Sequence, residues 1–215
     1  MAESLCYHAL IPGDLLGSAA SGTNIPVGAN LVCTLSGEGD FNTLVTSMFL
    51  HGGWFHLLGN MLFLWVFGDN VEDVMGPLRF LLFYVLCGLG AAAAQIVTDP
   101  GSLVPMVGAS GAIGGVMGAY AILFPRARVH LLLILVVYVT TVSVPAILML
   151  AYWFVLQLVS GVGALGASGG GVAFWAHVGG FVAGVALVFV FRDARLIEAR
   201  RRHLPGQRSA RHRWF

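Results

Sequence analysis

The chain has 215 residues, of which 58% are hydrophobic and only 10% are charged, and its formal net charge is +1. A soluble domain carries about 25% charged residues, so this composition excludes an ordinary water-soluble globular protein and indicates a polytopic membrane protein. The 29 glycines suit such a protein, because small residues let helix backbones approach closely in lipid.

Residues 1–30 contain neither a basic start nor a long apolar run, so the sequence predicts no cleavable signal peptide. We expect residues 1–47 to form an extracytoplasmic loop that lies along the membrane. Cys6 and Cys33 can pair there if both face an oxidising compartment, or they can remain free thiols, and the sequence leaves both open. No pair of cysteines has CxxC spacing, so a zinc or redox motif is not expected.

Five apolar stretches follow, and each is a candidate transmembrane helix, since crossing a bilayer takes about 20 apolar residues. They are residues 48–67, 78–97, 110–124, part of 131–160, and 172–191. The run 131–160 is longer than one helix needs, and Pro145 divides it at a position that favours a helix start. We therefore predict a helix from about Pro145, preceded over 131–144 by an apolar loop or re-entrant segment. The expected fold class is an all-α polytopic membrane helical bundle with five transmembrane helices.

The basic residues predict the orientation of these helices. All 11 are arginines, and they follow the first, third and fifth apolar stretches, whereas 1–47, 98–107 and 161–171 contain none. With five spans, the arginine-bearing flanks share one side of the membrane, and the positive-inside rule makes that side cytoplasmic. We expect a multi-pass protein of the inner or plasma membrane whose C-terminus is cytoplasmic. Its basic tail, 193–215, is predicted to lie near anionic lipid rather than nucleic acid.

Ser110 and His177 are polar residues at or near the starts of two apolar helices, and polar groups inside a bilayer usually mark function. Ser110 precedes Arg126 by 16 residues and His177 precedes Arg192 by 15, so the two side chains are expected at nearly equal depth. A hydroxyl beside an imidazole can act as an activated nucleophile. Because no carboxylate lies near His177 in the spans, we predict a catalytic dyad rather than a triad.

The first apolar stretch adds His51, His56 and Asn60. His56 and Asn60 are four residues apart and share a helical face. Together with Ser110 and His177, they predict a polar, water-accessible cavity that opens outward. The backbone N–H groups at the helix start, with His56 and Asn60 as side-chain donors, are suited to stabilising an oxyanion. Taken singly, each residue also fits an ordinary structural role in helix packing or interhelical hydrogen bonding.

No metal ligand set is predicted. The HExxH motif is absent, the spans hold almost no carboxylates, and His51 lies on a different helical face from His56 or in the loop before the helix. Two glycine pairs at four-residue spacing, Gly111 with Gly115 and Gly180 with Gly184, predict close contact between the third and fifth helices. Gln157 is predicted to form a helix–helix hydrogen bond, and Trp153 is expected to be a packing residue or an interface anchor.

The sequence resembles the rhomboid intramembrane serine proteases, and the resemblance covers nearly the whole chain from about residue 41. The motifs that carry it are His51-x4-His56-x3-Asn60, Gly108-Ala109-Ser110-Gly111 and Ala176-His177-x2-Gly180-x3-Gly184. The resemblance implies that Ser110 is the nucleophile and His177 the base, and that His56 and Asn60 assist at the oxyanion. His51 would be structural or would retain water. No cofactor, metal or nucleotide is implied.

The resemblance also implies a rhomboid-like transmembrane core over 48–192 and a cap over the active site formed by 131–144. The first of the family's six core helices is absent from this chain, which leaves five. Some members carry an aromatic residue four positions after the serine, stacked on the catalytic histidine. Gly114 stands there in this sequence, so other neighbours must position the imidazole.

The predicted function is therefore a serine endopeptidase that cleaves transmembrane segments of membrane proteins. One alternative is a catalytically inactive rhomboid-like protein that binds transmembrane clients. The other is a channel or transporter, which predicts polar groups in the cytoplasmic half of the helices as well. That half is almost wholly apolar here, which disfavours a channel or transporter.

Overall fold

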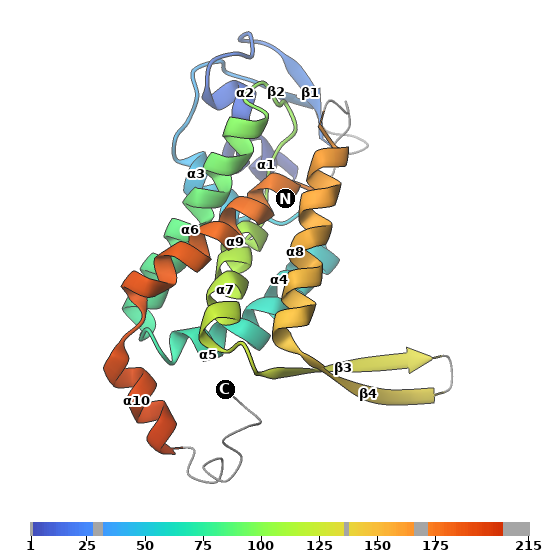
Figure 1. Ribbon diagram of the computed structural model, residues 1–215. Helices are drawn as coiled ribbons and strands as arrows, with labels where there is room; N and C mark the ends of the chain where they lie inside the picture. Colours follow the sequence, from blue (N-terminus) through green and yellow to red (C-terminus); the bar gives the residue numbers. More distant parts are fainter. Residues whose placement is uncertain (1, 28–31, 136–137, 166–171, 204–215) are drawn as a thin grey trace.

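The computed structural model describes residues 2–27, 32–135, 138–165 and 172–203, and it is mostly helical (Figure 1). Two small antiparallel sheets, each of two strands, accompany the helices. The elements in chain order are α1 (Ala2–His8), α2 (Pro12–Leu15), β1 (Asn24–Pro26), β2 (Val32–Thr34), α3 (Thr43–Thr46), α4 (Trp54–Phe63), α5 (Asp69–Glu72), α6 (Pro77–Thr98), α7 (Ser110–Leu123), β3 (Arg128–Leu135), β4 (Tyr138–Pro145), α8 (Ala146–Gly163), α9 (Phe174–Phe191) and α10 (Ala194–His203).

Helix α7 lies in the middle of the bundle, and every residue from Gly111 to Ala121 is buried. It packs closely against α9, and a side chain on Gly180 would overlap the carbonyl oxygen of Gly111. One turn further along, a side chain on Gly184 would overlap the carbonyl oxygen of Gly115. The predicted contact between the two glycine pairs is therefore confirmed, and it brings backbone directly against backbone.

In the part of the chain that the structure describes, three helices are long and apolar enough to cross a membrane, namely α6, α8 and α9, whereas α7 is apolar but shorter at 14 residues. The first apolar stretch becomes helical later than predicted. A 3₁₀ turn over Ser47–Phe49 precedes α4, and a π-helical turn over Leu64–Gly68 joins α4 to α5. The predicted helix start at Pro145 is confirmed, since α8 begins at the next residue. The count of five transmembrane helices stays a prediction.

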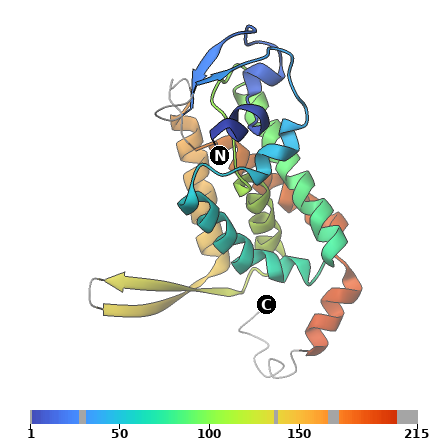
Figure 2. The ribbon, with the colours of Figure 1, turned by 180° about the vertical axis from the view of Figure 1, so that it is seen from behind.

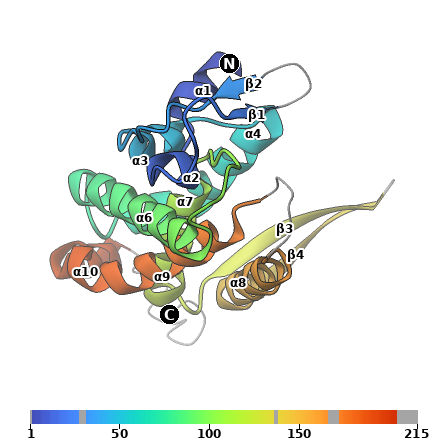
Figure 3. The same cartoon turned by 90° about the horizontal axis from the view of Figure 1, so that it is seen from above.

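Residues 131–135 and 138–144 lie in the paired strands β3 and β4, which extend away from the helices in Figure 3, so the expectations of an all-α fold and of an apolar loop or re-entrant segment were wrong here. Residues 136–137 of the predicted segment lie outside the described residues. Strands β3 and β4 pair in antiparallel register, with Arg128 opposite Pro145 and Leu135 opposite Tyr138. The β-branched residues of both strands favour this conformation over an irregular loop. The hairpin follows the C-terminal end of α7 and projects from that end of the bundle (Figures 1 and 2). It is therefore not the expected cap over Ser110, which begins the opposite end of α7.

The N-terminal region, expected to be a loop, is a small folded unit at the Ser110 end of the bundle (Figure 1). A disulfide joins Cys6 to Cys33, linking α1 to β2. Around it packs a cluster of buried apolar side chains that includes Ile11 and Ile25. Leu10 and Met106 exchange backbone hydrogen bonds of 3.1 and 2.7 Å, which tie this unit to the segment preceding Ser110. Of residues 1–47, Met1 and 28–31 lie outside the described residues.

Helix α10 follows α9 at the opposite end of the bundle (Figure 1). Charged side chains form ion pairs there. Arg79 lies 3.3 Å from Asp193, and Arg200 lies 3.2 Å from Asp73. Arg200 also donates a 2.6 Å hydrogen bond to the side-chain oxygen of Asn70. These contacts bring the start of α6 and the end of α9 together, as the distribution of the arginines predicted. Residues 204–215 of the predicted tail lie outside the described residues.

Candidate active site

Ser110 is the first residue of α7, and His177 lies in the first turn of α9. Their side chains meet, with 2.8 Å between His177 Nε2 and Ser110 Oγ. The contact is possible because the two helix backbones touch at Gly111 and Gly180, next in sequence to the serine and within a turn of the histidine. The two polar side chains therefore lie at the same level of the bundle, as their spacing from the arginines predicted.

The other ring nitrogen of His177 also has a partner. Gln157, on α8, places its Oε1 2.8 Å from His177 Nδ1. The hydrogen bond that we predicted between helices for Gln157 is therefore confirmed, but the sequence did not reveal that its partner is the histidine of the candidate dyad. Trp153 lies four residues before Gln157, and its ring centroid is 5.8 Å from that of the imidazole. This i, i+4 pair on one apolar helix was the signal available in the sequence.

Gly114 explains why the aromatic neighbour comes from α8. A Cβ atom on Gly114 would lie only 3.1 Å from the carbonyl oxygen of His177 and 3.6 Å from the ring of Trp153. A large side chain at this position of α7 has no room, because Trp153 already occupies the space beside the imidazole. The position four residues after the serine is therefore filled from a neighbouring helix.

His56 and Asn60, both on α4, lie against the backbone just before Ser110. A Cβ atom on Gly108 would come within 2.8 Å of His56 Nε2 and 3.6 Å of Asn60 Nδ2. Gly108 has a φ of 119°, a conformation that a residue with a side chain rarely adopts, so both the backbone and the space require glycine. Two side-chain nitrogens therefore lie close to the backbone segment that immediately precedes Ser110.

The protonation pattern of α4 fits a donor role. His56 Nδ1 accepts a 3.2 Å hydrogen bond from the backbone N–H of Gly52, so a neutral His56 carries its proton on Nε2. Asn60 is buried, and its Nδ2 has no hydrogen-bond partner among the described residues. His51 packs edge-on against His56 with 5.3 Å between the ring centroids, so the three predicted residues of this stretch lie together.

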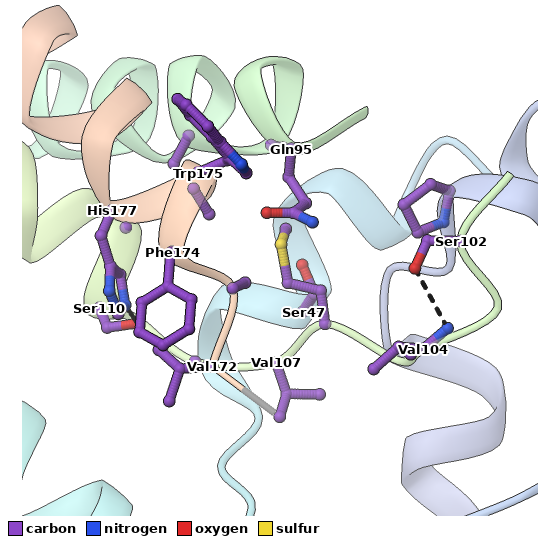
Figure 4. A pocket seen from close by; sticks show the side chains of 18 of the residues that line it. Ser47, Gln95, Ser102, Val104, Val107, Ser110, Val172, Phe174, Trp175 and His177 are labelled. Atoms are coloured by element: carbon purple, nitrogen blue, oxygen red, sulfur yellow. Dashed lines mark hydrogen bonds between the residues drawn. The ribbon is translucent and has the colours of Figure 1, made fainter. Parts of the chain in front are cut away.

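A cavity of about 760 Å³ is lined by Ser110, His177 and His56. Figure 4 shows the serine and histidine side by side with the ring of Phe174 next to them, and the amide of Gln95 pointing into the space. Cavities of roughly 300–1,000 Å³ are typical of ligand sites. The lining includes small residues such as Gly88 and Ala91, and the cavity reaches from the candidate dyad to the segment around Ser102.

The start of α7 adds backbone donors to this cavity. The first N–H groups of a helix have no partner within the helix, and no side chain caps α7. The positive end of the helix dipole also points toward the serine. A hydroxyl, an imidazole with an acceptor on its far side, and a group of N–H donors therefore meet at one wall of the cavity, which is the arrangement that acyl transfer requires.

A family model described as "Rhomboid domain" matches residues 38–194 of the chain. The chain belongs to the rhomboid family. With its three long apolar helices, this rhomboid-family chain is a multi-pass membrane protein. The match includes α4, α7, α8 and α9, which carry the polar side chains of the candidate site, and excludes most of the disulfide-linked N-terminal unit, although Pro12 of that unit also lines the cavity.

Several curated proteins are similar to this rhomboid-family chain. It is 40% identical over 103 residues to Rhomboid protease GluP of Bacillus subtilis, covering 48% of this chain and 20% of that protein. It is 40% identical over 83 residues to the Putative rhomboid protease YdcA of Bacillus subtilis, covering 39% and 41%. It is 39% identical over 82 residues to RHOMBOID-like protein 5 of Arabidopsis thaliana, covering 38% and 26%. The chain thus matches less than half the length of each of these relatives.

Proposed function

We propose that this rhomboid-family protein is an intramembrane serine endopeptidase that cleaves transmembrane segments of other membrane proteins with a Ser110–His177 dyad. The observation that carries the proposal is the 2.8 Å contact between His177 Nε2 and Ser110 Oγ at the wall of a cavity inside an apolar bundle. Similarity to two proteins named as rhomboid proteases supports it. An inactive client-binding protein would have no need for a hydroxyl and an imidazole held in this geometry.

In the proposed reaction, Ser110 Oγ attacks the carbonyl carbon of the scissile peptide bond while His177 Nε2 takes the hydroxyl proton. His177 then gives that proton to the leaving amine, which departs and leaves an acyl group on Ser110. Water attacks the acyl group with His177 again acting as base, which releases the second product and restores the serine. His177 Nε2 carries the proton in both halves of the reaction: from Ser110 Oγ to the leaving amine in the first half, and from water to Ser110 Oγ in the second.

The negative oxygen of the tetrahedral intermediate needs donors that are already in place. The N–H of Ser110 at the start of α7, the Nε2–H of His56 and the amide of Asn60 are proposed for this role. The support is that both α4 side chains lie against Gly108, two residues before the nucleophile, and that Asn60 Nδ2 has no partner among the described residues. Donors fixed in a low-dielectric site stabilise developing charge more strongly than water does.

The substrates are proposed to be membrane proteins whose helices unwind easily near small or helix-breaking residues. A peptide bond inside a helix is shielded because its own N–H and C=O groups are hydrogen-bonded, so it must leave the helix before Ser110 can attack. No metal, cofactor or nucleotide takes part in the proposed reaction.

The proposed orientation places the Ser110 end outside and the C-terminus in the cytoplasm, with five spans in the plasma or inner membrane. The Cys6–Cys33 disulfide supports it, because disulfides persist in oxidising compartments. The arginines at the opposite end of the bundle support the same orientation through the positive-inside rule.

Purified protein in detergent is expected to cleave a model transmembrane substrate, and Ser110→Ala and His177→Ala should each reduce cleavage to background. A fluorophosphonate probe should label the wild type and should not label Ser110→Ala, because it reacts with an activated serine. Cleavage that survives in either variant would eliminate the dyad. Binding of the substrate without cleavage or labelling would instead support the client-binding alternative.

A further inference from the structure

Helix α8 supplies two side chains that contact the imidazole ring of His177. Trp153 and Gln157 are four residues apart, so they project from the same side of the helix. Trp153 lies 5.8 Å from the imidazole between ring centroids, with an interplanar angle of 38°. Gln157 Oε1 lies 2.8 Å from Nδ1. The imidazole is therefore held between Ser110 on α7 and the α8 pair, with contacts at both of its nitrogens.

The identity of the Gln157 atom decides the tautomer of the histidine. An amide oxygen can only accept a hydrogen bond, so Nδ1 and Gln157 Oε1 form one only in the tautomer whose ring proton is on Nδ1. A neutral imidazole protonated at Nδ1 has its lone pair on Nε2, facing Ser110 Oγ at 2.8 Å. In the opposite tautomer, Nε2 would present a proton to the hydroxyl and could not accept one. An acceptor at Nδ1 therefore selects the form of His177 that can act as a base.

We propose that Gln157 is a positioning residue for His177, so that the working unit is a Ser110–His177–Gln157 array assembled from three helices. This inference rests on the proposed protease function. The amide takes the place that a carboxylate holds in a catalytic triad: it fixes the tautomer and orients the ring, and it favours the imidazolium that forms during attack. Trp153 assists by blocking rotation of the ring toward Gly114.

A purely structural role for Gln157, in which the hydrogen bond merely ties α8 to α9, makes different predictions. Loss of a structural bond would lower thermal stability and leave the chemistry of the folded protein unchanged. Loss of a positioning bond would lower kcat and change the pH dependence, because both depend on the imidazole. His56 and Asp99 are the other titratable side chains that line the cavity, and both are retained in the variants below.

Two variants and a control test the proposal, with cleavage measured across a pH series in detergent. Gln157→Leu removes the acceptor and is expected to lower kcat about 10- to 100-fold with little change in KM, as a misplaced catalytic group does. Gln157→Glu keeps an acceptor of the same shape and is expected to hold its plateau kcat within about tenfold of the wild type. Its acid limb should move to higher pH by about one unit, because a carboxylate favours the imidazolium. Val155→Leu alters an exposed position of the same helix and should match the wild type.

The outcomes separate this inference from the proposed function. If the wild type neither cleaves substrate nor reacts with a fluorophosphonate, the protease proposal fails. If the wild type is active but Gln157→Leu keeps its kcat and pH profile, only the role of Gln157 is overturned. An unmoved acid limb in Gln157→Glu overturns it too, and this variant still decides the question if Gln157→Leu does not fold. Lowered kcat in Gln157→Leu with a displaced limb in Gln157→Glu supports the array.

Discussion

The two ends of the helical bundle differ in whether their polar side chains have partners. At the Ser110 end, four buried side-chain atoms have no hydrogen-bond partner among the described residues: His51 Nε2, Asn60 Nδ2, Gln95 Oε1 and Trp175 Nε1. At the other end, Arg79 and Arg200 are matched with Asp193, Asp73 and Asn70. Gln95 and Trp175 line the cavity, and His51 and Asn60 lie beside His56 and Gly108, which also line it. Unpaired buried polar atoms destabilise a fold, so their presence at this end fits a site that meets substrate and water. The matched charges at the far end instead help to hold the helix ends together.

The contrast between the two ends predicts that replacing Asn60, at the Ser110 end, lowers activity strongly, whereas replacing Asn70, at the other end, leaves activity unchanged. Asn60→Ala or His56→Ala should lower kcat roughly 10- to 1000-fold, because each removes a donor proposed for the oxyanion. Asn70→Ala, which removes a partner of Arg200 at the far end, should leave kcat at the wild-type value. Steady-state cleavage of a transmembrane substrate measures both. Equal kcat in Asn60→Ala, His56→Ala and the wild type would remove α4 from the oxyanion role.

Breaking the disulfide should destabilise the unit at the Ser110 end. The Cys6–Cys33 bond closes a loop with a sequence separation of 27. Cys6→Ser combined with Cys33→Ser is expected to cost about 3 kcal/mol of unfolding free energy, mainly because the unfolded chain gains freedom. Thermal unfolding in detergent, with and without reductant, gives the measurement. The reductant should lower the Tm of the wild type and leave that of the double variant unchanged; a wild-type Tm that ignores reductant would contradict the prediction.

The close contact between α7 and α9 lies between the two ends of the bundle, and atoms added there should lower the stability of the protein. Gly184→Ala places a methyl group against the carbonyl oxygen of Gly115 and is expected to lower stability by about 2 kcal/mol through overpacking. Gly163→Ala makes the same change at the end of α8, where no atom of the described residues lies within 4 Å of the added methyl group, and should be neutral. Tm values in detergent compare the two. Equal Tm values would show that the backbones can separate without loss.

The smallest effect is expected at the charged end. Arg200→Ala removes an ion pair, two hydrogen bonds to Asn70 and a contact over the ring of Phe124. Because Asp73 is largely exposed, solvent screens the ion pair, and Arg200→Ala should lower the unfolding free energy by about 1 kcal/mol, measured by thermal unfolding in detergent. Arg202→Ala, whose partner Glu198 is also exposed, should show no measurable change. Added salt screens the ion pair, so it should reduce the difference in unfolding free energy between Arg200→Ala and the wild type. A difference that grows with salt would contradict this role of the ion pair.

Much of the candidate site could be predicted because its geometry follows from helix spacing. The interval from each polar residue to the next arginine placed Ser110 and His177 at one level, and the glycine pairs placed their helices in contact. His51 was harder, since it precedes α4 in a non-helical segment. The five-residue spacing left two places for it, a different helical face from His56 or the loop before the helix, and neither predicted that its ring packs edge-on against the His56 ring. Gln157 was assigned a helix–helix bond, but spacing along one helix cannot say which side chain on another helix it meets.

The prediction for 131–144 failed for a related reason. Its apolar residues suit a membrane-embedded loop as well as a strand, and only the pairing of Val129 with Val144 and of Leu133 with Thr140 distinguishes them. Such pairing joins two separate strands, so the hydropathy of either stretch by itself does not contain it. The N-terminal unit shows the same limit, because the disulfide and the Leu10–Met106 bridge are long-range contacts.

By itself, the sequence determined the membrane character of this protein, the approximate positions of its apolar helices, the shared level of the serine and the histidine, and the family motifs. These features depend on composition and on regular spacing along the chain, and both can be read from the amino-acid sequence. Only the tertiary structure decided that Gln157 and Trp153 reach His177, that Gly108 brings α4 against the backbone before Ser110, and that the apolar run after α7 is a hairpin remote from the site. Each of these is a contact between separate segments, and its geometry exists only once the helices have packed.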